Sequence, residues 1–399
     1  MNFDLTDDQI QVRDMVREFA QREVTPYIRQ WDANGEYHRE IIEKMGEAGF
    51  LGLPIPEEYG GLGLDYVSLA LACDELEYVD TSLRVVLSVH VGLNSLALLQ
   101  WGTEEQKQRW LVPQAAGEKI ATFGLTEPGA GSDAGSIATT AVRDGDSYIL
   151  NGNKMWISLA DLADHFLVFA TVDRSLKHKG LTAFVVERGM AGLTTGTIKG
   201  KLGVRAGNTG EIAFDNVRVP IENRIGEEGE GFKIAMSCID QGRFTVAAGA
   251  VGLTRASLDA STKYANERQT FGEPIGRHQL VQQMIANMVL GHETSRLLVM
   301  QAAELKNRGI RNTRETSLAK WHACDVALKA ADDAVQIHGS YGYSNEYPVE
   351  RFLRNARGSV IYEGTREIHT ILQAEYALGY RVDKPLSHPQ RPAPGFEES

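Results

Sequence analysis

The sequence predicts an α+β chain of several domains, with a middle antiparallel β domain between two helical domains. Apolar residues recur with helical spacing up to residue 118 and again from 233 to 383. Between these stretches, residues 119–232 contain short runs typical of strands, separated by turn-forming residues. This order differs from the regular alternation of strands and helices in a Rossmann fold. The length of 399 residues is sufficient for two or three packed domains.

The N-terminal domain, residues 1–118, is expected to be built from helices. Thr6 precedes an amphipathic run, and Thr103 with Gln106 has the spacing of a capping box. A Gly- and Pro-rich loop at 53–66 divides this domain in two. The first residues carry acids where a targeting signal needs bases, so we expect the protein in the cytoplasm or in an organelle matrix.

The middle domain, residues 119–232, is expected to be a small antiparallel sheet. Its predicted strands lie at 148–150, 155–157, 166–170, 182–186, 212–214 and 217–219. Asn151 and Gly152 both favour the positive φ of a two-residue turn. They therefore predict a hairpin between the first two strands.

The C-terminal domain, residues 233–383, is expected to be of the four-helix type. One long helix is predicted to end at Gly339. Its apolar face should consist of Leu318, Trp321, Cys324, Leu328, Ala331 and Val335. The remaining residues, 384–399, are predicted to form a loose tail.

Composition and charge exclude several classes of function. The net charge of −12, without any block of Lys and Arg, argues against a nucleic-acid partner. The uncharged stretch between Arg84 and Glu104 contains too many polar residues to predict a membrane span. The three cysteines, Cys73, Cys238 and Cys324, lie far apart with no His at ligand spacing, so we expect buried thiols and no metal site.

A glycine-rich segment at 129–135 superficially resembles a dinucleotide-binding fingerprint. That fingerprint has to follow a strand and open a helix, whereas strands are predicted after this segment. We therefore interpret it as a tight loop, whose backbone N–H groups can still bind a flavin or a phosphate.

Four segments resemble the acyl-CoA dehydrogenase family. They read LTEPGAGSD at 125–133, NERQTFG at 266–272, QIHG at 336–339 with NEYPVE at 345–350, and IYEGT at 361–365. The resemblance covers about residues 3 to 380 in one order and spacing. It implies two helical domains around a β domain, an FAD cofactor, and usually a homotetramer with FAD at the subunit interface.

By this resemblance Glu363 is the base that removes the α-proton of an acyl-CoA thioester. Its backbone N–H is expected to help bind the thioester oxygen. A carboxylate suits this task because exclusion of water raises its pKa towards that of the substrate. Some members of the family carry the base two residues after the Asp that corresponds to Asp240. This chain has Gly242 at that position, which favours Glu363.

The resemblance also predicts the residues that bind cofactor and substrate. The expected FAD contacts are Phe123, Leu125, Thr126, Gly131, Ser132, Trp156, Ser158, Arg268, Phe271, Gln336, Gly339, Thr365 and Glu367. Of these, Arg268, Phe271, Gln336 and Gly339 are expected to reach the FAD of a neighbouring subunit. The expected contacts with the CoA thioester are Ser132, Asp240, Arg243, Arg311, Tyr362 and Gly364.

The substrate's acyl chain is expected to end against the helix at 82–100. Arg84 and Ser88 lie one helical turn apart, and both match residues that hold the distal carboxylate in the glutaryl-CoA branch. Glu77 matches an acid that pairs with the Arg in that branch. Glu77 can also pair with Arg84 for a purely structural reason, so a short or branched monocarboxylyl-CoA is our main prediction. Glutaryl-CoA or another dicarboxylyl-CoA, with or without decarboxylation, is the alternative.

Three other functions of the same fold stay open. An acyl-CoA oxidase would pass its electrons to O₂, but such chains are commonly longer. A flavin-free scaffold would not need Glu363, and a flavin monooxygenase or nitroalkane oxidase often has an altered base. For a dehydrogenase, an electron-transferring flavoprotein is the expected electron acceptor, by family analogy alone.

Overall fold

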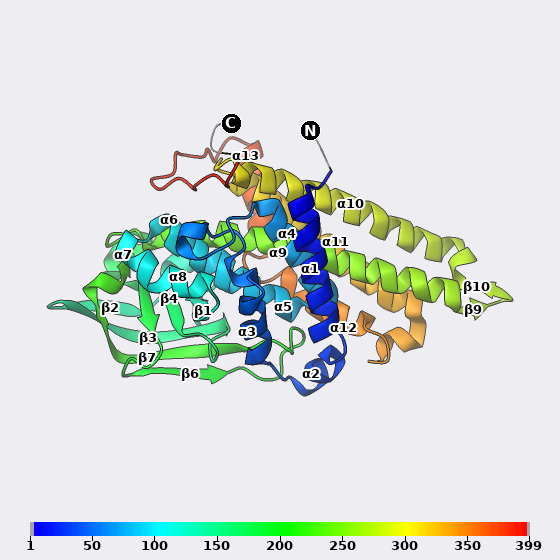
Figure 1. Cartoon of the computed structure of the whole chain (residues 1–399), viewed down its shortest axis with the longest axis horizontal. Helices are drawn as coiled ribbons and strands as arrows, with labels where there is room; N and C mark the ends of the chain where they lie inside the picture. Colours follow the sequence, from blue (N-terminus) through cyan, green and yellow to red (C-terminus); the bar gives the residue numbers. More distant parts are fainter. Residues whose placement is uncertain (1–3, 397–399) are drawn as a thin grey trace.

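A computed structural model describes residues 4–396 of the chain. A β domain lies at one end of the molecule, and long helices extend to the other end (Figure 1). The N-terminal helices lie between these two parts and contact both. The predicted order of a helical, a β and a helical domain is confirmed.

The N-terminal part contains eight α-helices. They are α1 Asp7–Glu23, α2 Ile28–Asn34, α3 Arg39–Glu47, α4 Tyr66–Val79, α5 Thr81–Val86, α6 Leu96–Trp101, α7 Glu104–Gln106 and α8 Val112–Ala115. Both predicted capping boxes are present, Thr6 with Gln9 at α1 and Thr103 with Gln106 at α7. A loop with short 3₁₀ turns separates α3 from α4, as the glycines and prolines predicted.

One apolar helix runs through the centre of the molecule. It comprises α5, the π-helical segment η3 at Leu87–Ser95, and α6. By length and composition Thr81–Trp101 could cross a membrane, yet 89% of its most apolar window is buried inside the protein. This burial is typical of a core helix. Its π-helical turn widens the helix beside the predicted acyl pocket.

The β domain is one sheet of eight strands. They are β1 Ala121–Gly124, β2 Thr140–Asp144, β3 Ser147–Ser158, β4 His165–Thr171, β5 Leu181–Glu187, β6 Leu193–Thr197, β7 Thr209–Pro220 and β8 Arg224–Ile225. Their order is β6-β7-β3-β2-β4-β5-β8, with β1 added beside β4. The sheet is mostly antiparallel as predicted, although β4 pairs in parallel with β1 and β2.

The predicted hairpin at Asn151–Gly152 is wrong. Both residues lie inside β3, which runs unbroken from Ser147 to Ser158. Gly152 marks an irregularity in the pairing with β7, and an added Cβ there would lie 2.6 Å from the hydroxyl of Thr139. The glycine therefore permits a close approach of two segments rather than a chain reversal. The actual turn before β3 contains Gly145, whose φ is 63°.

The C-terminal part is built on three long helices, α9 Gly231–Glu267, α10 Gln279–Asn307 and α11 Thr313–His338. The shorter α12 Val349–Ser359 and α13 Arg366–Ala377 pack against α11. Helix α11 ends at Gly339 as predicted. Its predicted apolar face is only partly correct. Leu318, Trp321, Leu328 and Val335 are half-buried, whereas the fully buried face consists mainly of alanines with Ser317 and Lys320. Small side chains occupy the buried face because α9 and α11 pack closely.

Parts of the predicted loose tail contact the rest of the chain. Residues 384–396 contain no helix or strand, but they lie against the helices and the loop after α3. Gln100 donates a hydrogen bond to the carbonyl of His388, whose ring lies 4.3 Å from that of Trp101. Ala393 donates its N–H to the Asn307 carbonyl and is buried. The last part of the predicted tail, 397–399, is outside the described residues.

Glycines on α9 allow the central helices to approach closely. A Cβ at Gly252 would lie 2.0 Å from the Asp74 carbonyl of α4, and one at Gly249 would lie 2.0 Å from the Glu77 carboxylate. The same contact is closed by Arg255, which pairs with Asp74 at 2.6 Å. The placement of α4 and α5 against α9 depends on these two glycines.

We expect Gly252→Ala to destabilise the fold by about 2–4 kcal/mol, because the Asp74 backbone cannot move away without separating α4 from α9. The measurement is the free energy of unfolding from denaturant titration. Gly135→Ala is the control, since its Cβ would meet only ordinary contacts from 3.5 Å outwards. Equal stability of both variants would contradict the close-packing argument.

Candidate active site

The candidate base lies in a strained turn between α12 and α13. Glu363 has φ 53° and Gly364 has φ 99°, both in the left-handed half of the backbone map. Thr365 follows as the N-cap of α13 and accepts a hydrogen bond from the N–H of Ile368. A positive φ in a non-glycine residue is uncommon, and its occurrence at a candidate catalytic residue indicates a functional constraint.

The Glu363 carboxylate lies directly over Gly242 of α9. A Cβ at Gly242 would be 1.7 Å from Oε2 of Glu363, so any other residue there would displace the base. Oε2 is buried and has no hydrogen-bond partner among the described residues. Burial raises the pKa of Glu363 to about 7, and the positive charges of Arg84, Lys320 and Arg243 limit the rise. This is a group that can exchange a proton near neutral pH.

A buried network of polar side chains lies next to Tyr362, the residue before the base. Arg84 is 1% exposed and pairs with Glu77 at 2.6 Å. It also donates to the hydroxyls of Ser88 at 3.0 Å and Tyr362 at 2.7 Å. Ser88 in turn hydrogen-bonds with Thr245 of α9. The structure thus brings together the predicted Arg84, Ser88 and Tyr362, and each of these three side chains has a protein partner.

The predicted CoA-binding residues lie on the other side of Glu363. Arg243 donates to the Glu363 carbonyl at 3.4 Å and to Asp240 at 3.0 Å. The other Asp240 oxygen accepts a hydrogen bond from Thr313 at the start of α11. Arg311 is two residues away from Thr313 but pairs with Asp383 and donates to the Lys384 carbonyl. The structure therefore adds the tail as a partner of Arg311, which sequence reasoning did not foresee.

The predicted flavin segments lie side by side along β1 and the second half of β3. The N–H of Met155 donates to the Thr126 carbonyl, and Thr122 donates to the Ser158 carbonyl. The π-helical segment connects them to the base, because Asn94 donates to the Thr122 carbonyl while Leu93 lies against Gly242.

The flavin loop is held by a buried ion pair. Lys154 of β3 is fully buried and donates both to Glu127 at 2.7 Å and to the Leu125 carbonyl at 3.1 Å. Burial lowers the pKa of Lys154 to about 8, and the adjacent Glu127 carboxylate opposes this. Glu127 also accepts hydrogen bonds from the N–H groups of Ala138 and Thr139. The pair fixes the start of the loop that leads to Gly131 and Ser132.

The residues of the predicted flavin segments suit a large planar cofactor such as FAD. Trp156 is 56% exposed and has φ 63°, so a big aromatic surface is presented outwards by a strained backbone. Gly129 and Gly131 have open space where a Cβ would be, and Ser132 is exposed. Phe123 is half-buried and contacts Phe169. An open glycine loop beside an exposed indole fits a flavin and its phosphates.

Four predicted cofactor residues lie elsewhere. Arg268 and Phe271 belong to the two-stranded hairpin β9 Gln269–Thr270 and β10 Glu273–Pro274, at the end of the molecule opposite the sheet (Figure 1). Phe271 is 97% exposed and has φ 51°. Gln336 and Gly339 are exposed near the same end, where His338 stacks on Tyr264 at 4.2 Å. Within one chain these residues are separated from the flavin loop. Glu367 is exposed on α13, close in sequence to the base.

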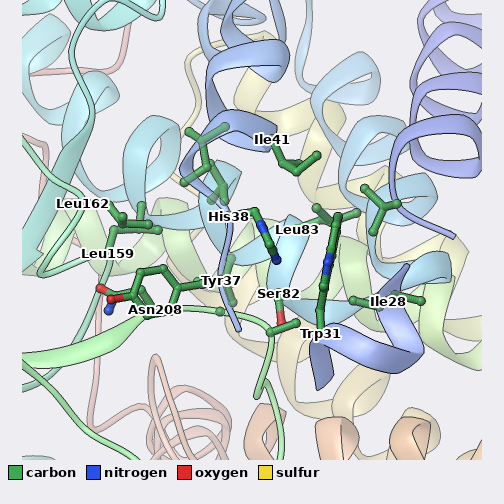
Figure 2. Close-up of a pocket in the computed structure, with 16 residues that line it drawn as sticks. Ile28, Trp31, Tyr37, His38, Ile41, Ser82, Leu83, Leu159, Leu162 and Asn208 are labelled. Carbon is green, nitrogen blue, oxygen red and sulfur yellow. The ribbon is translucent and has the colours of Figure 1, made fainter. Parts of the chain in front are cut away.

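Three cavities among the described residues contain none of the predicted site residues. Figure 2 shows one of about 40 Å³, in which Trp31, Tyr37 and His38 face Ser82 and Leu159 across the boundary between α2, α5 and the sheet. It has room for a few water molecules at most. Another, of about 490 Å³, lies between α2 and α12. Among residues 4–396, no group of three or more His, Cys, Asp or Glu side chains could hold a metal ion.

Comparison with known proteins assigns the chain. Three family models match in succession: the acyl-CoA dehydrogenase N-terminal domain at 6–118, the middle domain at 122–217 and the C-terminal domain at 229–378. The chain belongs to the acyl-CoA dehydrogenase family. It is therefore an FAD-dependent oxidoreductase, as the sequence motifs predicted.

Individual relatives of this acyl-CoA dehydrogenase are similar over nearly their whole length. A short-chain specific acyl-CoA dehydrogenase of Clostridium acetobutylicum is 44% identical over 372 residues, 93% of this chain and 98% of that protein. The structure of butyryl-CoA dehydrogenase from Megasphaera elsdenii matches with a TM-score of 0.93 and 40% identity, over 95% of this chain and 100% of that one. A glutaryl-CoA dehydrogenase in complex with glutaryl-CoA matches with a TM-score of 0.92 and 38% identity, over 98% and 99%.

Several residues of the site were not identified from the sequence. Thr245, Gly249 and Lys320 lie in helices where their neighbours give no sign of a special role. Glu127 stands within the recognised loop, and a buried lysine opposite it in the following strand is a pairing that only the fold reveals. The three cysteines are buried and unpaired, as predicted.

We expect Glu363→Gln to change stability in a pH-dependent way. The pKa of Glu363 in the folded protein, about 7, lies above its ordinary value of 4.5, so the folded state binds more protons between these pH values. Wild type therefore loses stability as pH rises from about 4.5 to 7, whereas the Gln variant does not. The difference in unfolding free energy should grow by up to about 3 kcal/mol across this window and stay constant above it.

The measurement is the unfolding free energy of both proteins between pH 4 and pH 9. Glu118→Gln, at an exposed position, serves as the control and should run parallel to wild type. Parallel curves for wild type and Glu363→Gln would contradict a raised pKa at the base.

Proposed function

We propose that this enzyme oxidises a short-chain, straight or branched acyl-CoA to the 2-enoyl-CoA, with Glu363 as the α-proton base. The observation that carries the proposal is the Glu363 carboxylate. It is buried over Gly242 with an unpartnered oxygen and a pKa of about 7. A carboxylate in this state can accept a weakly acidic proton at neutral pH.

The residues around the base are arranged to stabilise the reacting thioester. Glu363 takes the proton from the α-carbon, a hydride leaves the β-carbon, and the two carbons become joined by a double bond. Bound FAD supplies the acceptor for the hydride. The N–H of Glu363 has no hydrogen-bond partner among the described residues and is available to the thioester oxygen. Gly364 and Tyr362 on either side set the direction of that N–H.

The polar network of Arg84 supports a short acyl chain. Glu77, Ser88, Thr245 and Tyr362 are bound to Arg84 or to each other, so they close the pocket beyond Glu363. The charge of Arg84 is already neutralised by Glu77. Because the glutaryl-CoA branch carries a corresponding acid beside its Arg, the pair by itself does not separate the two substrate classes. The short-chain substrate is favoured over glutaryl-CoA by the similarity to the short-chain specific relative.

The remaining roles are proposed from the resemblance of these residues to those of the family. We assign FAD contacts to Phe123, Leu125, Thr126, Gly131, Ser132, Trp156, Ser158, Thr365 and Glu367. Arg243, Asp240, Arg311 and Ser132 are proposed to hold CoA, with Arg311 exchanging its tail contact for a phosphate.

A homotetramer is part of the proposal because Arg268, Phe271, Gln336 and Gly339 lie at the end opposite the flavin loop. Only a second chain could bring them to the same FAD. An electron-transferring flavoprotein as acceptor and a cytoplasmic or matrix location stay predictions from the family. The acid at 363 and the intact flavin edge argue against a flavin-free scaffold.

The first test is an anaerobic titration that follows flavin absorbance near 450 nm. We expect butyryl-CoA to bleach the flavin of the wild-type enzyme, with the rate rising as pH increases through about 7, because Glu363 must be ionised. Glu363→Gln should retain FAD and bind CoA thioesters, yet lose turnover by roughly 10³-fold or more. Near-normal turnover of this variant would refute the assignment of the base. Peroxide formation under air would indicate an oxidase instead.

A second test separates the two substrate classes. We expect Arg84→Met combined with Glu77→Met, which removes both buried charges together, to alter the kcat/KM of butyryl-CoA and glutaryl-CoA by similar factors. The physical reason is that Arg84 and Glu77 compensate each other. Wild type should also reduce its flavin faster with butyryl-CoA. A loss confined to glutaryl-CoA, at least about tenfold, would restore the dicarboxylyl alternative.

A further inference from the structure

A buried lysine supports the turn that carries the base. Lys320 of α11 is 1% exposed, and its Nζ donates to the Gly364 carbonyl at 2.7 Å. No carboxylate within the described residues 4–396 forms a salt bridge with it. Burying an ammonium group without such a partner is costly, so a lysine at this position requires a compensating role.

We propose that Lys320 is a positioning residue for the base, which holds the Glu363–Gly364 turn in place and supplies the counter-charge of the Glu363 carboxylate. The inference rests on the proposed function of Glu363 as the α-proton base. It adds a residue on a different helix, which does not touch the substrate and acts only through the turn.

The geometry of the turn explains why Lys320 is needed to hold Glu363 and Gly364 in place. Glu363 adopts φ 53°, a conformation that costs a non-glycine residue free energy unless its surroundings impose it. Arg243 reaches the Glu363 carbonyl at 3.4 Å, a long contact, whereas Lys320 binds the next carbonyl at 2.7 Å. The N–H of Arg366 closes the turn onto the Val360 carbonyl. The charge-assisted bond from Lys320 is the shorter of the two side-chain contacts that hold this backbone.

The distribution of charge explains why Lys320 serves as the counter-charge of the Glu363 carboxylate. The charged and titratable groups that face Glu363 and Lys320 are Glu77 of α4, Arg84 of α5, Asp240 and Arg243 of α9, Cys324 of α11, Tyr362 of the turn and His369 of α13. Arg84 pairs with Glu77, and Arg243 pairs with Asp240. His369 stays neutral, because burial and the nearby cations lower its pKa. Burial raises the pKa values of Cys324 and Tyr362, so these two groups also stay neutral. Lys320 is therefore the cation without an acid of its own, and Glu363 is the acid without a cation of its own.

Lys320 and Glu363 attract each other as opposite charges without a direct hydrogen bond or salt bridge. Burial lowers the pKa of Lys320, while the Glu363 carboxylate opposes this change. Conversely, Lys320 opposes the rise in the pKa of Glu363. A thioester that fills the pocket removes water from both groups and strengthens their interaction. Lys320 thus keeps the base ionised at the moment when desolvation would otherwise protonate it.

The test compares Lys320→Met with Lys306→Met in the FAD-loaded enzyme. Lys306 is an equally buried lysine of α10, 1% exposed, whose Nζ donates to Gln241 and does not touch the turn. The measurements are kcat and KM for butyryl-CoA between pH 5 and pH 9.5, FAD content, the melting temperature, and the pH dependence of binding of the 2-enoyl product. Lys320→Gln keeps a donor for the Gly364 carbonyl but removes the charge.

We expect Lys320→Met to lower kcat at least about tenfold and to move the acid limb of its pH profile upwards by roughly one unit. The shift is upward because loss of a nearby cation raises the pKa of a carboxyl group. KM and FAD content should change little. Lys320→Gln should show the same pH shift with a smaller loss of kcat. Lys306→Met should retain FAD and leave the pH profile in place.

An unshifted profile in both Lys320 variants would overturn the proposal, as would equal shifts in the Lys306 and Lys320 variants. If Lys320→Met does not fold, the Gln variant decides the question by the same criterion. A failure of the proposed function would look different. Wild type itself would not reduce its flavin with any acyl-CoA, or Glu363→Gln would remain active.

Discussion

The structure is organised around the burial of one carboxylate that has to remain able to ionise. A carboxyl group moved out of water tends to become neutral, whereas the proposed reaction needs it charged at neutral pH. The protein resolves this conflict with position. Glu363 is placed over a glycine, within reach of three cations but in hydrogen-bonded contact with none of them through Oε2. Its pKa of about 7 is the balance of burial against these charges. A direct salt bridge would have kept the group ionised and removed its basicity.

That balance requires helices to come closer than ordinary side chains permit. Gly242 makes room for the carboxylate, and Gly249 does the same for the pair of Glu77 and Arg84. Both lie on α9, so a single helix sets the spacing between Glu363 and the pair of Glu77 and Arg84. The π-helical turn of η3 lies opposite, where Leu93 approaches Gly242. Backbone spacing, rather than side-chain length, thus determines how closely these groups approach one another.

The sequence predicted the order of domains and the caps, because these leave local or family-specific patterns, and several of the residues proposed for the active site lie together in the structure. The base, Arg243, Asp240, Arg84 and Tyr362 all converge in the structure. Local patterns failed where a tertiary contact decides the conformation. Gly152 looks like a turn residue, yet its role is to let β3 pass Thr139. The apolar side chains of α11 suggest its buried face, but the interior accepts alanines and Lys320 instead. The polar tail gives no sign that it follows the surface of the helices.

The buried lysines and arginines differ in whether a carboxylate pairs with them. Lys154 is matched by Glu127, Arg84 by Glu77, and Arg243 by Asp240. In such a pair the carboxylate cancels part of the cation's field at a distance. Lys306 lacks a carboxylate too, but its Nζ donates to the side chain of Gln241 and not to the turn. Arg84, Lys320 and Arg243 all oppose the rise in the pKa of Glu363. Of these three cations, Lys320 alone has no salt bridge among the described residues, and it donates directly to the turn.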